Sequence, residues 1–192
     1  MITWNYKGAL AALALISLAA CEEGQGGAFP QTSTATRPVA LSQAKMAFGA
    51  VTLMAPIGFC IDKSSLKQNF ALMARCDALG APSASAGAPT AILTASFSRA
   101  STTIPTALDT TTALGLDAPS DAVEYENSVT FRARGPSPAK GLSGTHWRGT
   151  ARVGTQMMGL ALYGPAGGRA VSAEGRALLV ALIAKMSSET QD

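Results

Sequence analysis

The sequence has little of the chemistry that most enzymes and metal proteins need. A single histidine, His146, and three cysteines stand among 192 residues, and only 12 residues are acidic. A Ser-His-Asp triad would have to use His146, and no Gly-x-Ser-x-Gly turn carries its nucleophile. Motifs for dinucleotides, zinc proteases, calcium loops and c-type haem are also missing from the sequence. We therefore expect no enzyme, no metal and no cofactor.

The acidic residues offer one weak exception. Glu124 and Glu126 fall on the same face of an expected strand. Paired carboxylates can act in hydrolysis, but a lone pair of this kind on a strand is usually solvated. A hydrolase with dispersed carboxylates is therefore the least favoured function.

Positive charge is also sparse. The chain has 15 Lys and Arg residues and a formal net charge of +3, and the basic residues form no run. Nucleic-acid-binding domains concentrate basic residues in a patch or along a stripe. We therefore expect no nucleic-acid partner.

Long hydrophobic runs are missing too. The apolar run over residues 8–20, which follows Lys7, is short of the roughly 20 residues that a membrane-spanning helix needs. A basic start, a short apolar core and small residues at its end are the parts of a secretory signal peptide. The sequence thus predicts a signal peptide over residues 1–20.

Leu18-Ala19-Ala20-Cys21, at the end of that run, resembles the lipobox of bacterial lipoproteins. The resemblance implies cleavage before Cys21 and attachment of acyl chains, such as palmitate, to that residue. Two or three acyl chains hold a protein on a membrane. An ordinary signal peptide cut after Ala20, with Cys21 incidental, is the less favoured alternative.

The lipobox also implies a location in the cell envelope, facing the periplasm. In enterobacteria, Asp directly after the lipidated Cys favours the inner membrane. This chain has Glu22 at that position, so we favour the outer membrane.

The mature chain divides into a tether and a domain. Residues 21–38 begin with the lipidated Cys and continue as a segment rich in Gly, Thr and Pro, without hydrophobic periodicity. Such a segment is typical of a flexible linker, with a reach of roughly 20 to 25 Å. Residues 39–192 have a length that suits one domain.

Cys60 and Cys76 are the two cysteines left once Cys21 carries lipid. In an oxidising compartment such a pair is expected to form a disulfide. If their strands form a hairpin with Cys60 opposite Cys76, the turn falls at residues 67–69. A redox-active pair, or a zinc site that adds His146, fits the spacing less well.

Hydrophobic patterns predict an α+β fold, with a mostly antiparallel sheet of six or seven strands and a C-terminal helix packed on one face. Residues 39–48 could form a short helix or an irregular lead-in, and residues 103–116 are ambiguous. The C-terminal helix is expected over residues 172–186, with Ser172 as its N-cap. The expected strands cover residues 49–55, 57–62, 70–77, 91–98, 123–134 and, as a pair with a break near 150–152, 145–162.

His146-Trp147-Arg148 is the triplet richest in functional side chains. Alternation along a strand favours Trp147 in the core, with His146 and Arg148 on the outer face. The alternative is a ligand or partner contact in which Trp147 is an anchor and Arg148 binds an anion. Its pocket would lie near the loop over residues 135–144.

Residues 55–62 (Ala-Pro-Ile-Gly-Phe-Cys-Ile-Asp) and 70–76 (Phe-Ala-Leu-Met-Ala-Arg-Cys) are similar to segments of uncharacterised envelope lipoproteins of alphaproteobacteria. The similarity continues through His146-Trp147-Arg148-Gly149 and the terminal helix. This resemblance implies no activity and no catalytic residue. The leading expectation is a membrane-anchored accessory module that binds another envelope protein, and the alternative is a periplasmic module for a small ligand.

Overall fold

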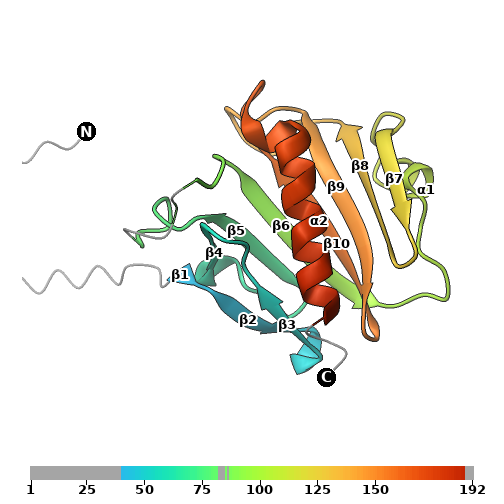
Figure 1. Ribbon diagram of the computed structural model, residues 1–192, viewed down its shortest axis with the longest axis horizontal. Helices are drawn as coiled ribbons and strands as arrows, with labels where there is room; N and C mark the ends of the chain where they lie inside the picture. The colour runs from blue at the N-terminus through green and yellow to red at the C-terminus, as the bar shows by residue number, and fades with distance from the viewer. Residues whose placement is uncertain (1–39, 82–84, 86, 189–192) are drawn as a thin grey trace, which may run out of the picture. The chain divides into compact units, whose positions relative to one another are not determined.

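The computed structural model describes residues 40–81, 85 and 87–188, and these form one large sheet, a two-stranded ribbon and two α-helices (Figure 1). The lipobox, Cys21 and the tether expected over residues 21–38 lie outside the described residues. The expected α+β class, with a mainly antiparallel sheet and a C-terminal helix on one face, is confirmed.

The large sheet has eight strands, and every neighbouring pair in it is antiparallel. In spatial order they are β1 (Ala40–Leu41), β4 (Phe59–Asp62), β5 (Phe70–Arg75), β6 (Ile92–Arg99), β10 (Gln156–Tyr163), β9 (Thr145–Val153), β8 (Ser128–Arg134) and β7 (Ser120–Tyr125). A separate ribbon pairs β2 (Gln43–Met46) with β3 (Val51–Met54).

The main core lies between the sheet and α2 (Ala173–Ser188). Leu179, Leu182, Ile183 and Met186 form a buried stripe on the helix. They belong to the same apolar cluster as alternate residues of the central strands and as Leu53 of the ribbon. Burial of this stripe, rather than helix propensity, is what stabilises such a helix in water.

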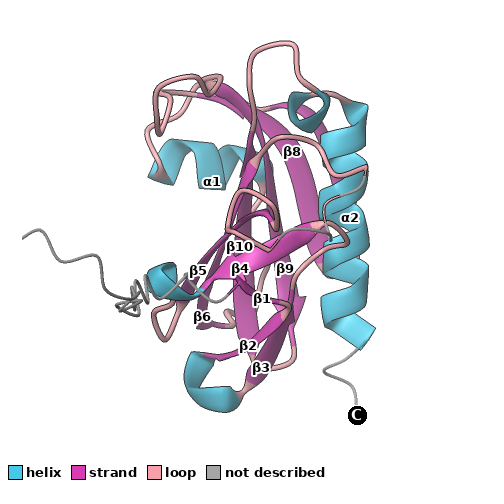
Figure 2. Cartoon of the chain, turned by 90° about the vertical axis from the view of Figure 1, so that its left-hand side faces the viewer, coloured by secondary structure: helices cyan, strands magenta, loops and turns pink. Residues whose placement is uncertain are grey.

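The second helix, α1 (Ala107–Ala113), lies on the opposite face of the sheet (Figure 2). Thr106 caps it, since its side chain accepts a bond from the Asp109 amide and the Asp109 carboxylate accepts one from the Thr106 amide. This capping box satisfies two amides at the helix start. A smaller apolar cluster beneath α1 contains Ala107 together with Val129, Phe131 and Ala133 of β8.

The start of α2 is packed tightly. The Glu174 amide donates to Ser172 Oγ over 3.2 Å, which agrees with Ser172 as the cap. A Cβ on Gly175 would lie 1.8 Å from the Ala170 carbonyl oxygen and 3.0 Å from Trp147 Cδ1. Glycine is therefore the residue that allows the helix to approach β9 this closely.

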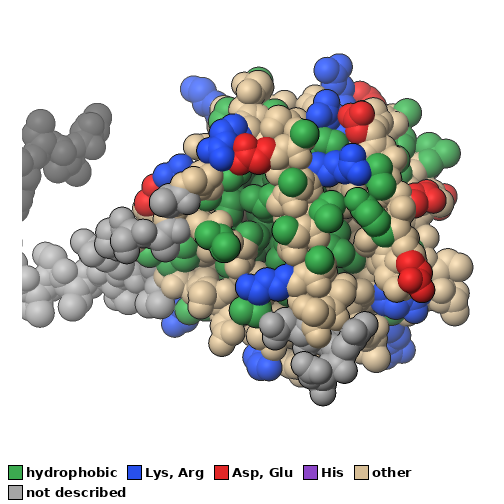
Figure 3. Space-filling model, viewed as in Figure 1, with side chains coloured by type: hydrophobic (Ala, Val, Ile, Leu, Met, Phe, Trp, Pro, Cys, Tyr) green, Lys and Arg blue, Asp and Glu red, His purple; other side chains and the backbone are tan. Residues whose placement is uncertain are grey.

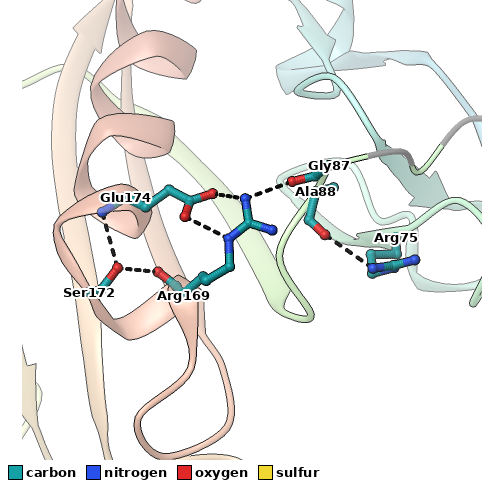
Figure 4. Close-up of polar contacts among 6 residues, drawn as sticks. All are labelled: Arg75, Gly87, Ala88, Arg169, Ser172 and Glu174. Carbon is teal, nitrogen blue, oxygen red and sulfur yellow. Dashed lines mark hydrogen bonds and ion pairs between the residues drawn. The ribbon is translucent and has the colours of Figure 1, made fainter.

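Two arginines fix the segment that leads into β6 (Figure 4). Arg169 forms an ion pair with Glu174 and also donates to the Gly87 carbonyl over 2.9 Å. Arg75, at the end of β5, donates to the Ala88 carbonyl over 3.1 Å and pairs with Asp77. The guanidinium of Arg75 holds the pKa of the Asp77 carboxyl well below its usual range. The segment before β6 is thus bonded both to the end of β5 and to the turn that leads into α2.

The expected disulfide is present between Cys60 and Cys76, with their Cα atoms 4.8 Å apart. Both residues are buried. The expected hairpin register is wrong by two residues, because Cys60 stands opposite Ala74 and Cys76 lies beyond the end of β5. Since the disulfide uses both thiols, neither cysteine is available as a zinc ligand.

The strand count and two boundaries also differ from expectation. The large sheet has eight strands rather than six or seven, because β1 joins it and residues 120–134 form a hairpin, β7–β8, while the strand expected at residues 49–55 pairs with β2 in the separate ribbon instead. Residues 43–46 form strand β2 rather than a short helix or an irregular lead-in. The turn between β9 and β10 falls at residues 154–155 and not near 150–152, because Gly154 supplies the positive φ of 57° that a tight turn needs.

Both edges of the large sheet are irregular. At one edge β1 has two residues in the part of the chain that the structure describes. At the other edge β7 carries a bulge between Ser120 and Val123, and Asp121 adopts a φ of 51°. Short or bulged edges do not present a continuous row of free backbone groups.

Candidate functional site

Strand β9 places the three residues of the His146-Trp147-Arg148 triplet on two faces of the sheet. Trp147 is 2% exposed and lies in the core with α2. Its Nε1–H donates to the Ser172 carbonyl over 2.7 Å, and the Arg132 guanidinium lies 4.8 Å from the ring centroid. Trp147 therefore connects β9 to the start of α2.

His146 and Arg148 project from the other face, where they form a hydrogen-bonded chain. Arg148 Nε donates to His146 Nε2 over 2.9 Å, and Arg148 Nη2 donates to the Tyr163 hydroxyl over 3.1 Å. The rings of His146 and Tyr163 stack with their centroids 4.3 Å apart. His146 lies on the face opposite Trp147, but it is only 1% exposed and is therefore buried there rather than facing solvent.

The hydrogen bonds determine the tautomer of His146. Because Nε2 accepts from Arg148, the ring proton must be on Nδ1, which then donates to the Gly144 carbonyl over 2.9 Å. Burial lowers the pKa of His146 below 6.5, and the charge of Arg148 acts in the same direction against the bond to Gly144. The imidazole is thus neutral at pH 7 and serves as an acceptor for Arg148.

This pKa shift predicts a loss of stability in mild acid. The unfolded chain binds a proton at His146 near pH 6.5 while the folded chain does not, so the free energy of unfolding should fall as the pH drops below about 6.5. Each unit by which the folded pKa is lowered is worth about 1.4 kcal/mol. Urea unfolding followed by circular dichroism between pH 7.5 and 5.5 measures the slope.

The matched control is His146→Gln, which keeps an acceptor for Arg148 but does not titrate. Because the chain has one histidine, this variant should show a much flatter dependence over the same interval. Equal slopes for the two proteins would contradict the assignment to His146.

Beside Arg148 a cleft of about 440 Å³ runs between α1 and the exposed face of the central strands. Its floor includes Gly159 and Ala161 of β10, and Thr94 and Ser96 of β6 stand next to them. The wall on the α1 side is formed by Pro105, Asp109, Thr110, Ala113 and Leu114. Pockets of this size accommodate small organic ligands.

The cleft coincides only in part with the pocket that we expected from the sequence. Of the triplet, only Arg148 lines the cleft, and the loop over residues 135–144 contributes a carbonyl to His146 rather than a wall. The contributions of Thr94, Ser96 and Gly159 were missed. The sequence did carry a signal for the residues of β6, because polar Thr94, Ser96 and Ser98 alternate there with apolar residues.

A second hollow, of about 310 Å³, lies on the opposite face beside α2. Leu178, Ala181, Leu182 and Lys185 line it from the helix, and Pro56 and Ile57 line it from the turn between β3 and β4. The Ile57 side chain is 92% exposed. Figure 3 shows hydrophobic side chains gathered over this face. We call this surface the Ile57 groove.

Other features that we considered from the sequence do not form a site in the described part of the chain. Among residues 40–81, 85 and 87–188, no three His, Cys, Asp or Glu side chains converge to hold a metal ion. Glu124 and Glu126 are both exposed, on β7 and the turn after it. Of the helices in the described part of the chain, none is long and apolar enough to cross a membrane.

No protein-family model, curated protein or solved structure matches this chain.

Proposed function

We propose that this protein is a lipid-anchored accessory module of the bacterial cell envelope, which binds another envelope protein and is not an enzyme. Cys21 would carry the lipid, and the domain would face the periplasm, most simply from the outer membrane. The Cys60–Cys76 disulfide supports an extracytoplasmic location, since such bonds persist in oxidising compartments.

The observation that carries the binding role is the Ile57 groove. An isoleucine that is 92% exposed at the tip of a turn leaves most of its apolar surface in water, and burial of such surface contributes roughly 25 cal/mol per Å². The adjoining hollow is also apolar, apart from Lys185. No carboxylate of the described residues pairs with Lys185. A partner that fits here presents an apolar side chain flanked by an acidic group.

The test is cross-linking in intact cells with a photoreactive amino acid in place of Ile57. We expect capture of an envelope protein, and a fall of about tenfold or more when Cys21→Ser removes the anchor, because confinement on a membrane raises the effective concentration. Mass spectrometry of the captured species identifies the partner.

The same photoreactive residue at Leu108 is the matched control. Leu108 is also an exposed apolar residue, 60% accessible, but lies on α1 at the opposite face. Capture at Ile57 and not at Leu108 would place the partner on the α2 face. Equal capture with and without Cys21, or no capture at Ile57, would count against the proposal.

The cleft beside Arg148 supports a second candidate function, binding of a small ligand. This candidate is compatible with the same location and uses the other face of the sheet.

A further inference from the structure

Arg148 carries a positive charge that no carboxylate of the described residues neutralises. Its acceptors, His146 Nε2 and Tyr163 Oη, are both uncharged. These two bonds use Nε and Nη2 of the guanidinium. No acceptor among the described residues bonds to Nη1, so we take the end of the guanidinium formed by Nη1 and Nη2 as its free edge, which can hold a carboxylate through two parallel hydrogen bonds.

The free edge is already held in position before any ligand arrives. The imidazole that accepts from Arg148 is itself bonded to Gly144 and stacked on Tyr163. A ligand therefore does not have to immobilise a mobile arginine, which lowers the entropic cost of binding. Arg148 also lines the cleft, so a bound anion would be at one end of it.

The floor beyond Arg148 is bare and suits an apolar body. A Cβ on Gly159 would meet only Ser96 Oγ, at 2.9 Å, within the 4 Å surroundings of that position. Ala161 continues the floor, and Leu114, which is 50% exposed, covers it from α1. Burial of a ligand's hydrocarbon between Leu114 and this floor would be favourable.

Asp109, on the α1 wall, restricts the charge of the ligand. Its carboxylate accepts bonds from the amide and the hydroxyl of Thr106, and these bonds lower its pKa, so it stays ionised. It forms no ion pair with Arg148. A second negative charge on a ligand would be repelled by Asp109, whereas a single charge placed at Arg148 satisfies the arginine.

We propose that the cleft binds an amphiphilic monocarboxylate, with the carboxylate on the free edge of Arg148 and the hydrocarbon over Gly159 and beneath Leu114. This site goes beyond the accessory role proposed above and rests on the small-ligand candidate alone.

The test is a titration of the full chain, isotopically labelled and carrying Cys21→Ser in every sample so that no attached acyl chain competes. The probes are octanoate, the uncharged octanamide and octyl phosphate. Two-dimensional NMR follows the Gly159 amide and the Nε–Hε of Arg148. We expect octanoate to shift both signals, octyl phosphate to bind more weakly and octanamide to bind weakest.

Three variants assign the effect. Arg148→Gln should weaken octanoate binding by about tenfold or more. Gly159→Val, which fills the floor with a residue that suits a strand, should do the same. Arg176→Gln removes an arginine from α2, outside the cleft lining, and should leave binding unchanged. Thermal unfolding of each variant confirms that it is folded.

The possible outcomes separate the two levels of the proposal. Octanamide binding as tightly as octanoate, or an unchanged affinity in Arg148→Gln, would overturn the carboxylate site while the small-ligand function stands. Tighter binding of octyl phosphate would overturn the preference for a single charge. Binding that Gly159→Val leaves intact would mean a surface ion pair and no cleft ligand. If none of the three probes shifts either signal, the small-ligand candidate also fails.

Discussion

Replacement of Trp147 with alanine is expected to lower the free energy of unfolding by about 3–5 kcal/mol, the range for a large aromatic residue removed from a packed core. Trp147 is 2% exposed and belongs to the cluster that joins the sheet to α2. The substitution also removes the bond from Nε1 to the Ser172 carbonyl and the contact with Arg132. Urea unfolding monitored by circular dichroism measures the loss.

Two controls separate packing from the hydrogen bond and from general effects of aromatic removal. Trp147→Phe keeps much of the ring volume and should cost about 1–2 kcal/mol, mainly for the lost N–H bond. Tyr125→Ala removes an aromatic residue that is 46% exposed on β7, so its effect should stay within about 0.5 kcal/mol. A loss at Trp147→Ala no larger than that at Tyr125→Ala would contradict the assigned core position.

Removal of the disulfide is the second large change. In the double variant Cys60→Ala, Cys76→Ala, the free energy of unfolding should fall by about 3 kcal/mol, since the bond closes a loop over a sequence separation of 16 residues. Denaturation midpoints of the oxidised wild type and the double variant give the difference.

A reductant provides the internal control. Dithiothreitol should lower the stability of the wild type toward that of the double variant and should leave the double variant unchanged. Because Cys60 and Cys76 are 8% and 2% exposed, long incubation is needed for the reductant to reach the bond. If the stability of the wild type stays unchanged after the disulfide has been fully reduced, the disulfide adds nothing to stability.

The elements that the sequence predicted well are those with a strong local pattern. The terminal helix has a cap at Ser172, an acidic residue in its first turn and a stripe at helical spacing, and it forms over Ala173–Ser188. The strand expected at residues 70–77 alternates along its length and appears as Phe70–Arg75. The disulfide was predicted from the expected oxidising compartment and from the number of cysteines alone.

The errors occurred where long-range contacts decide the structure. Gln43–Met46 has only four residues, too few for a clear local pattern, and becomes a strand because β3 pairs with it. Residues 129–134 were expected to form a half-exposed strand, yet Thr130 is fully buried together with Phe131, because the two faces of β8 are covered from opposite sides. No local sequence pattern indicates that both faces of a strand are covered by other elements.

The cleft was the least predictable feature because its parts come from distant segments. Thr94, Arg148 and Gly159 become neighbours through the order β6-β10-β9, and α1 then closes over them. Gly175 shows the same limit in a helix. Its residue type indicates only weak helix propensity, whereas the structure shows that a side chain there would collide with Ala170.

The irregular edges of the sheet have a consequence for a protein held on a membrane as proposed. Molecules confined to a surface meet one another far more often than molecules in free solution, and strand pairing between neighbouring copies would join their sheets into ribbons. The two-residue β1 and the bulge after Ser120 in β7 deny a neighbouring strand a regular row of partners. If the domain is anchored as proposed, its sheet edges therefore oppose polymerisation even when copies are crowded on the membrane.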